Sequence, residues 1–380
     1  VGSEMCIRDR CMRVLASYIQ ALNLSDLGLS DEHQEILDNA IHKPFGMILV
    51  VGPTGSGKTT TLYALLKMIN KPDVNITTIE DPVEYKVEWM NQIQVNPVTD
   101  LTFAQGLRSI VRQDPDKILV GEIRDHETAE ISVNAALTGH LLLSTFHAND
   151  APTCVPRIAD MGIEPFLLAS TLEVVVAQRL VRLICTNCRY STETKIEDLD
   201  TPKLKCAMKY FPKKGFKLYR GKGCKACKHT GYRGQTALYE FIQVDQKMEE
   251  LIITSPTSQE IWDLARENGA KTLFEDGIDK VKNGITTLED LLRVAQPPEN
   301  VSEEMLAEIR GETKSKKATV KKSAPRKTES KPSKEVEQDE VPDTQIEIGT
   351  SDDTSKEKAT SAKDKESKPT ATSKKEDAKK

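Results

Sequence analysis

Residues 46–59 read GMILVVGPTGSGKT, and the expected architecture of the whole chain follows from this stretch. Residues 46–51 form a short apolar run, typical of a strand that is buried on both faces. Residues 52–59 match the pattern G-x-x-x-x-G-K-[ST] at every position. The segment KTTTLYALLKMI (58–69) has the composition of a helix, and Pro72 is expected to end it. Strand, glycine-rich loop and helix therefore follow one another in the order that a phosphate-binding loop requires.

The residue types in this loop suit the binding of a nucleoside triphosphate. Glycines let backbone N–H groups turn toward phosphate oxygens, and the N-terminus of a helix adds positive potential. Lys58 is placed to reach the β- and γ-phosphates, and the Thr59 hydroxyl is placed to ligate Mg²⁺. The predicted nucleotide-binding residues are Gly52, Pro53, Thr54, Gly55, Ser56, Gly57, Lys58, Thr59 and Thr60.

Three further short apolar runs predict the rest of a mainly parallel sheet. They are NITTIED (75–81), KILVGEI (117–123) and LLLSTFH (141–147), and segments of helical composition such as ETAEISVNAAL (127–137) alternate with them. Strands that crossover helices cover on both faces have this pattern. We therefore predict an α/β fold with a mainly parallel sheet around the phosphate-binding loop.

Acidic residues follow two of these strands, where ligands collect in open α/β sheets. Glu122 is the candidate that polarises an attacking water. Gly121 stands where such ATPases usually carry an aspartate, so metal binding is expected to involve Thr59, water and neighbouring carboxylates. Those carboxylates are Glu80, Asp81 and Glu84. Either acidic run alone would be read as a solvated strand end.

Two histidines and two arginines are further candidates. His140 precedes the strand 141–147 and His147 ends it, so the pair is interpreted either as ordinary loop residues or as sensors of the γ-phosphate. Arg108 and Arg112 are four residues apart on a helix that Thr99 and Asp100 are expected to cap. They are either a salt-bridged surface or arginine fingers that reach the nucleotide of a neighbouring subunit.

Two Cys-x-x-Cys pairs predict a metal centre. Cys185 and Cys188 form the first pair, and Cys224 and Cys227 form the second. Two such pairs can close a tetrahedral Zn²⁺ site, and four thiolates leave no open position for catalysis. The site is therefore expected to be structural, with redox chemistry of the pairs as the alternative.

Composition and charge exclude several classes of protein. The chain has 380 residues and a formal net charge of −5, which argues against a protein whose main task is to neutralise nucleic-acid phosphates. No apolar run approaches the roughly 18 residues of a membrane span, and no secretory signal is evident. Paired cysteines in a long chain suit a reducing compartment. We expect a cytoplasmic protein that can still dock on a membrane.

Changes of composition divide the chain into six segments. Residues 1–11 resemble a sequencing or assembly scar, and 12–40 are expected to be the remnant of a preceding domain. The segment 297–380 carries 19 basic and 19 acidic residues and no aromatic residue, so it is expected to be a disordered charged tail. Between them lie the predicted ATPase core (41–184), the tetracysteine metal-binding module (185–240) and a small helical C-terminal region (241–296).

Taken together, these motifs resemble the secretion-motor ATPases of type II secretion and type IV pilus assembly. GPTGSGKTTTLY is similar to the Walker A box of that family, ITTIEDPVEY to its Asp box, KILVGEIRD to its Walker B box and TGHLLLSTFHAND to its His box. QRLVRLICTNC and GCKACKHTGYRGQTALYEF are similar to the metal-binding insert of the assembly branch, and DGIDKVKNGITTLEDLLRVA resembles the C-terminal helical end. The resemblance spans roughly residues 12–296.

The resemblance implies a RecA-like P-loop NTPase core and an ATP-hydrolysing motor that assembles as a homo-hexamer. Its partners would be an inner-membrane platform protein and cytoplasmic assembly proteins, with no nucleic acid, and it would act at the cytoplasmic face of the inner membrane. ATP, Mg²⁺ and Zn²⁺ are the implied cofactors. Glu122 would be the catalytic carboxylate, Glu80, Asp81 and Glu84 the Asp box, Arg108 and Arg112 the ring-interface arginines, and His140 and His147 the His box.

Two departures from the family pattern bear on this expectation. Family members carry an N-terminal docking domain and a second domain that contributes further arginines, whereas residues 12–40 would be only a remnant. The charged tail is also foreign to the pattern. The chain is therefore expected to bind ATP but to hexamerise or hydrolyse it poorly. A nucleotide-dependent scaffold and a nucleic-acid translocase remain the alternatives, and the sequence does not identify the exported product or the organism.

Overall fold

The computed structural model describes residues 23–194, 207–212, 215–298 and 310. The predicted scar at 1–11 lies outside these residues, as do the start of the predicted remnant (12–22) and nearly all of the predicted tail. The chain divides into two units, residues 1–317 and 318–380, and every described residue belongs to the first.

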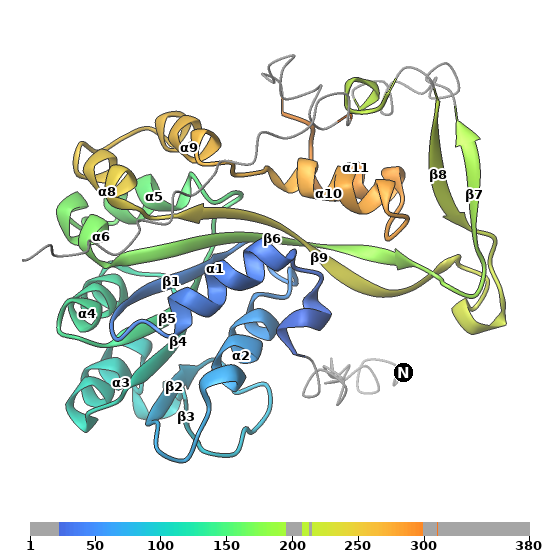
Figure 1. The fold of residues 1–380 in the computed structure, drawn as a ribbon. Coiled ribbons are helices and arrows are strands. Elements are labelled where there is room, and N and C mark those ends of the chain that lie inside the picture. The colour runs from blue at the N-terminus through green and yellow to red at the C-terminus, as the bar shows by residue number, and fades with distance from the viewer. Residues whose placement is uncertain (1–22, 195–206, 213–214, 299–309, 311–380) are drawn as a thin grey trace, which may run out of the picture. The chain divides into compact units, whose positions relative to one another are not determined.

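Seven strands of the described chain form one sheet in the order β3-β2-β4-β5-β1-β6-β9 (Figure 1). The strands from β3 to β6 are parallel to their neighbours, and β9 pairs antiparallel with β6. The four runs predicted from sequence are all strands of this sheet. The bounds are β1 Gly46–Val51, β2 Ile76–Glu80, β3 Met90–Gln94, β4 Lys117–Ile123, β5 Leu141–Phe146, β6 Leu172–Ile184 and β9 Tyr232–Gln243.

Both faces of the sheet are covered, which explains the continuous apolar runs. Along β1, Met47, Leu49 and Val51 point into one core cluster, while Ile48 and Val50 point into the other. The first face carries α3 (Phe103–Ile110), α4 (His126–Leu137), α5 (Cys154–Asp160), α6 (Pro165–Thr171), α8 (Gln246–Ile253), α9 (Ser258–Glu267), α10 (Leu273–Lys282) and α11 (Leu288–Val294). The second carries the 3-10 turn η2 (Leu24–Leu27), α1 (Asp31–Ile41) and α2 (Lys58–Ile69).

The strands β6 and β9 have 13 and 12 residues, about twice the length of their neighbours in the sheet. They form a long antiparallel ribbon that leads to a second, two-stranded sheet of β7 (Arg189–Thr194) and β8 (Phe216–Gly221) (Figure 1). The module predicted at 185–240 is therefore too long, because residues 232–240 belong to a strand of the main sheet.

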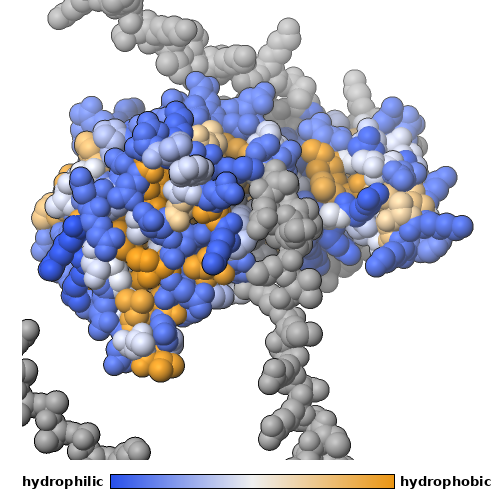
Figure 2. Space-filling view, turned by 90° about the horizontal axis from the view of Figure 1, so that it is seen from below, coloured by the Kyte–Doolittle hydropathy of each residue, from blue (hydrophilic) through white to orange (hydrophobic). Residues whose placement is uncertain are grey.

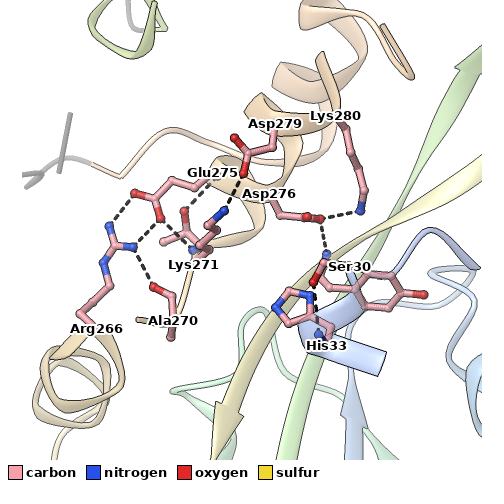
Figure 3. Close-up of polar contacts among 11 residues, drawn as sticks. Ser30, His33, Arg266, Ala270, Lys271, Glu275, Asp276, Asp279 and Lys280 are labelled. Atoms are coloured by element: carbon pink, nitrogen blue, oxygen red, sulfur yellow. Dashed lines mark hydrogen bonds and ion pairs between the residues drawn. The ribbon is translucent and has the colours of Figure 1, made fainter. Parts of the chain in front are cut away.

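The outer edge of β9 is covered by charged side chains of α10. Asp276 accepts a hydrogen bond from the Tyr239 N–H at 2.9 Å, and Lys280 donates one to the Ala237 carbonyl at 2.6 Å. Asp276 and Lys280 also pair with each other at 2.7 Å, as Figure 3 shows. Two of the backbone groups that an edge strand would expose are thus satisfied without a further strand.

The surface seen in Figure 2 is largely hydrophilic, with apolar residues gathered in a band between charged ones. Large apolar side chains that remain exposed in the described chain include Phe45, Trp89, Val98 and Phe166. Among the described helices, none combines the length and the apolar character that crossing a membrane would require.

The predicted domain boundary at residue 40 does not exist in the structure. Helix α1 runs across it, and Leu37 and Ile41 lie fully buried in the same cluster as Leu65 of α2 and Val50 of β1. Residues 24–41 are therefore part of the core rather than a separate remnant.

This assignment predicts a large effect of truncating Leu37. Leu37→Ala is expected to lower the free energy of unfolding by about 2–5 kcal/mol, because it leaves a cavity beneath α1. The matched control is Glu35→Ala on the exposed side of the same helix, which should change stability by about 0.5 kcal/mol or less. Denaturant unfolding of both variants measures the difference, and equal stabilities would show that α1 does not contribute to the core.

Candidate functional site

Four parallel strands bring candidate residues to one edge of the sheet. Because β2, β4, β5 and β1 are neighbours and run in the same direction, their carboxyl ends meet there. Glu80 ends β2, Glu122 lies near the end of β4, His147 follows β5, and the glycine-rich loop follows β1. Residues spread over about 100 positions of sequence thus share a single edge, as the strand pattern predicted.

The glycine-rich loop has the backbone of a phosphate cradle. Gly52, Gly55 and Gly57 have φ angles of 148°, 77° and 88°, which disfavour any side chain. Lys58 begins α2, and its Nζ donates hydrogen bonds to the carbonyls of Gly52 (2.9 Å) and Pro53 (3.1 Å). Burial lowers the pKa of Lys58, and the nearby Glu122 carboxylate opposes that shift. The ammonium group therefore lies on the inner side of the loop, close to the carboxylate.

Gln178 of β6 supports this loop from beneath, and it was not among the predicted site residues. Its Oε1 accepts a hydrogen bond from the Thr61 hydroxyl of α2 at 2.8 Å. A Cβ at Gly57 would lie 2.9 Å from the Gln178 side chain, and one at Gly52 would lie 2.6 Å from the Gln178 carbonyl. The only signal in sequence was a polar residue that interrupts the apolar run of β6.

The loop fits a phosphate group. The Ser56 Oγ is buried and has no hydrogen-bond partner among the described residues, so it is a polar atom in need of one. The first N–H groups of α2 point out of the helix end without intrahelical acceptors. Thr59 lies exposed in that first turn. The residues predicted for nucleotide binding are therefore all contiguous around one helix N-terminus.

Glu122 is held between two basic side chains. Its Oε1 lies 2.5 Å from an Arg124 guanidinium nitrogen, and its Oε2 lies 3.3 Å from the His147 Nε2. The hydrogen bond to Glu122 raises the pKa of Arg124. Arg124 was not among the predicted site residues, although its position two residues after Glu122 in KILVGEIRD could have suggested it. These two contacts hold the Glu122 carboxylate in one orientation.

Gly121 has a packing role that explains the missing aspartate. A Cβ there would lie 3.2 Å from the Ile79 carbonyl and 3.3 Å from the Glu80 Cα. Its own carbonyl accepts a hydrogen bond from the Thr145 hydroxyl at 2.7 Å. A side chain at this position would therefore be in tight contact with β2, and the neighbouring backbone would have to shift by a few tenths of an ångström.

The Asp-box residues differ in their surroundings. Glu80 is only 3% exposed, and it accepts hydrogen bonds from the Tyr63 hydroxyl at 2.5 Å and the Thr78 hydroxyl at 2.6 Å. Burial, together with this carboxylate, raises the pKa of Tyr63. Asp81 is exposed, and Glu84 is half-buried. Of the three carboxylates, Asp81 faces solvent, and Glu80 is already satisfied by hydroxyl donors.

His140 lies at the opposite edge of the sheet from His147. It directly precedes β5, whose first residue pairs with Gly46 at the start of β1, whereas His147 follows the other end of that strand. The His140 Nδ1 lies 3.0 Å from the Ala135 carbonyl. Within one chain His147 therefore contacts Glu122 and His140 lies away from it, and a role of either histidine in sensing the γ-phosphate stays a prediction.

The two arginines do not share a helix face. Helix α3 begins after the N-cap Thr102, not at Thr99 or Asp100, and it ends at Ile110. Arg108 lies in its last turn and pairs with Glu127 of α4 at 2.6 Å. Arg112 lies in the 3-10 turn η4 (Val111–Gln113), where the residue spacing of an α-helix no longer holds. Their role at a neighbouring subunit stays a prediction.

The four predicted cysteines lie together at the far end of the β6–β9 ribbon. Their sulfur atoms lie within 4.8 Å of one another. Cys185 and Cys224 are 3.9 Å apart, Cys188 and Cys227 are 3.9 Å apart, and Cys224 and Cys227 are 3.7 Å apart. Four sulfurs around one ion at metal–sulfur distances of about 2.3 Å would have edges of about 3.8 Å. The cluster therefore has the dimensions of a tetrahedral metal site.

Comparison with known proteins gives the family. A model of the type II/IV secretion system protein family matches residues 5–293, most of the chain. The chain belongs to this family. The resemblance drawn from the motifs is thereby confirmed.

Curated relatives of this secretion-system protein are similar over three quarters of its length. Type II secretion system protein E of Pseudomonas aeruginosa is 47% identical over 286 residues, which are 75% of this chain and 55% of that protein. The type IV pilus assembly ATPase PilB of Thermus thermophilus is 45% identical over 281 residues, 74% of this chain and 31% of that protein. The chain spans about half the length of the first of these relatives and about a third of the second.

A solved structure confirms the predicted α/β fold of this family member. The pilus retraction motor PilT, crystallised with bound ADP, matches with a TM-score of 0.56 at 29% identity, covering 76% of this chain and 71% of that one. The parallel sheet and the glycine-rich loop are therefore those of a known ATPase fold.

Within the cysteine cluster, Cys227 is surrounded by donors that favour its thiolate form. The Cys227 sulfur accepts hydrogen bonds from the N–H groups of Cys224 at 3.1 Å and Gly231 at 3.3 Å. These donors lower the pKa of Cys227 to about 6. A thiolate is the form of cysteine that binds metal ions, so the cluster is prepared for one.

Substitution at Gly121 tests whether packing or charge disfavours an aspartate at this position of β4. Gly121→Asp and Gly121→Ala are both expected to lower the free energy of unfolding by about 1–3 kcal/mol, because the added Cβ meets the backbone of β2. Denaturant unfolding measures both variants. A stable Gly121→Ala beside an unstable Gly121→Asp would contradict the packing argument and point to charge repulsion from Glu122.

Proposed function

We propose that this chain is the ATP-hydrolysing part of a motor that powers the assembly of a type II secretion pseudopilus or a type IV pilus. The observation that carries the proposal is the convergence of Lys58, Glu122 and His147 on one edge of the sheet. The names of the relatives, a type II secretion protein E and a pilus assembly ATPase, agree with it.

Each part of this edge has a distinct task in hydrolysis. The loop N–H groups and Lys58 bind the β- and γ-phosphates of ATP, and the Thr59 hydroxyl holds Mg²⁺. The metal, when bound, neutralises the charge that develops on the phosphates. Glu122 orients and deprotonates the attacking water, and Arg124 and His147 fix the direction of its carboxylate (2.5 and 3.3 Å). Asp81, which follows Glu80 and is exposed, would hold a water molecule bound to the metal.

The motor is proposed to work as a homo-hexamer at the cytoplasmic face of the inner membrane. Arg108 is about half-exposed, and we propose that it and Arg112 face the nucleotide of a neighbouring subunit. ATP turnover would move subunits against one another and act on an inner-membrane platform protein and cytoplasmic assembly proteins. No nucleic-acid partner is proposed.

Glu122→Gln is expected to leave nucleotide affinity within about twofold and to lower kcat by about 10²–10⁴-fold, because the amide cannot accept the proton of water. A phosphate-release assay and nucleotide titration measure the two quantities.

His147→Ala should also lower kcat. His140→Ala is the matched control and should not, because His140 lies at the opposite edge. Unchanged turnover in Glu122→Gln would remove this residue from the mechanism, and ATP binding without turnover in the unmodified chain would favour the scaffold alternative.

The cysteine cluster is proposed to hold a structural Zn²⁺. We expect about one zinc per chain, since four thiolates close the coordination sphere. Elemental analysis of Cys188→Ser, purified under reducing conditions, should show that most of the zinc is lost and thermal unfolding should occur at a lower temperature. Cys154→Ala is the control, because Cys154 lies buried in α5 apart from the cluster. Absence of zinc from the unmodified chain would refute the assignment.

A further inference from the structure

Residues 147–151, which begin with His147 directly after β5, form neither helix nor strand. Their backbone is held by three side chains from later elements: Arg157 of α5 donates to the His147 carbonyl, Arg179 of β6 donates to the Asn149 carbonyl at 2.8 Å, and Glu240 of β9 accepts from the Ala151 N–H at 2.8 Å. The position of His147 therefore depends on residues distant in sequence.

Glu240 is the unusual member of this set. It is 5% exposed, and the guanidinium of Arg179 is close enough to attract it, although the described residues form no direct ion pair with it. Its second oxygen accepts a hydrogen bond from the Leu273 N–H at 3.3 Å. Burial, together with the nearby Asp150 and Glu275, raises its pKa to about 7. A buried carboxylate without a direct ion pair costs free energy, and its two N–H partners, together with the attraction of Arg179, stabilise it here.

The second partner connects the segment to the C-terminal helices. Leu273 is the first residue of α10, so the Glu240 carboxylate also lies at the N-terminus of that helix. Helix α10 is fastened to β9 by Asp276 and Lys280 and to α9 by the Arg266–Glu275 pair (2.5 Å), as Figure 3 shows. One side chain thus joins the backbone beside His147 to an element that is anchored independently.

We propose that Glu240 is a positioning residue for ATP hydrolysis, which fixes segment 147–151 so that His147 stays against Glu122 and which ties that segment to the start of α10. This role rests on the proposed function. Glu240 does not touch the phosphate loop in the structure, and it acts through Ala151. Its removal should therefore slow turnover and leave nucleotide binding intact.

The direct test is hydrogen–deuterium exchange of the full chain. Glu240→Ala is expected to raise the exchange rate of the Ala151 amide at least about tenfold, because that N–H loses its acceptor. Glu240→Gln should restore part of the protection, since its amide oxygen can accept the same bond. The matched control is Asp276→Asn, a buried carboxyl that also joins α10 to β9 but does not contact segment 147–151. Unchanged exchange at Ala151 in Glu240→Ala would overturn the proposal.

Kinetics distinguish positioning from general stabilisation. Glu240→Ala is expected to lower kcat about 10- to 100-fold with the KM for ATP within about twofold, and Glu240→Gln should lower it less, while Asp276→Asn keeps kcat. In the His147→Ala background Glu240→Ala should lower kcat by less than about threefold, because the interaction that Glu240 supports is gone. Full additivity of the two substitutions would contradict the proposal. Absence of turnover in the unmodified chain would refute the proposed function, and the exchange measurement would still decide the role of Glu240.

Discussion

The site of this protein depends on the parallel pairing of β2, β4, β5 and β1. Parallel strands that start at one edge of a sheet must end at the other, and here the ends carry Glu80, Glu122, His147 and the glycine-rich loop. No single motif creates this arrangement. The same constraint keeps His140 away from the site, because the six residues of β5 separate it from His147. The direction of the strands therefore selects which polar residues share the site.

Polar side chains buried beneath the site hold its parts in place. Gln178 and Arg179, adjacent residues of β6, hold the phosphate-loop helix and the segment after His147, respectively. Glu240 accepts the Ala151 N–H, which would otherwise be unsatisfied in the core. Each of these groups is costly to bury alone and stable only with its partner. Such interactions make the relative positions of helix α2, segment 147–151 and helix α10 specific.

The module that carries the four cysteines is an extension of the main sheet rather than a separate domain. Strands β6 and β9 continue beyond their neighbours, and the cysteine pairs occur where the ribbon ends and β7 and β8 begin. Arg182 of β6 binds the fully buried Asp290 of α11, which fastens the last helix to the same ribbon. The helix after the glycine-rich loop, the cysteine cluster and helix α11 are thus all attached to β6.

The amino-acid sequence alone determined the local features: the four apolar strands, the phosphate loop, the cysteine pairs and the family. These depend on periodicity, glycine backbone freedom and ligand spacing, which act over a few residues. Tertiary structure decided the rest. It placed α1 in the core, ended α3 before Arg112, packed Gly121 tightly against β2 and brought Arg124, Gln178 and Glu240 to the site or beside it. Those outcomes depend on which strands pair and which polar groups are buried together, and interactions between residues far apart in the chain leave no pattern within a short stretch of sequence.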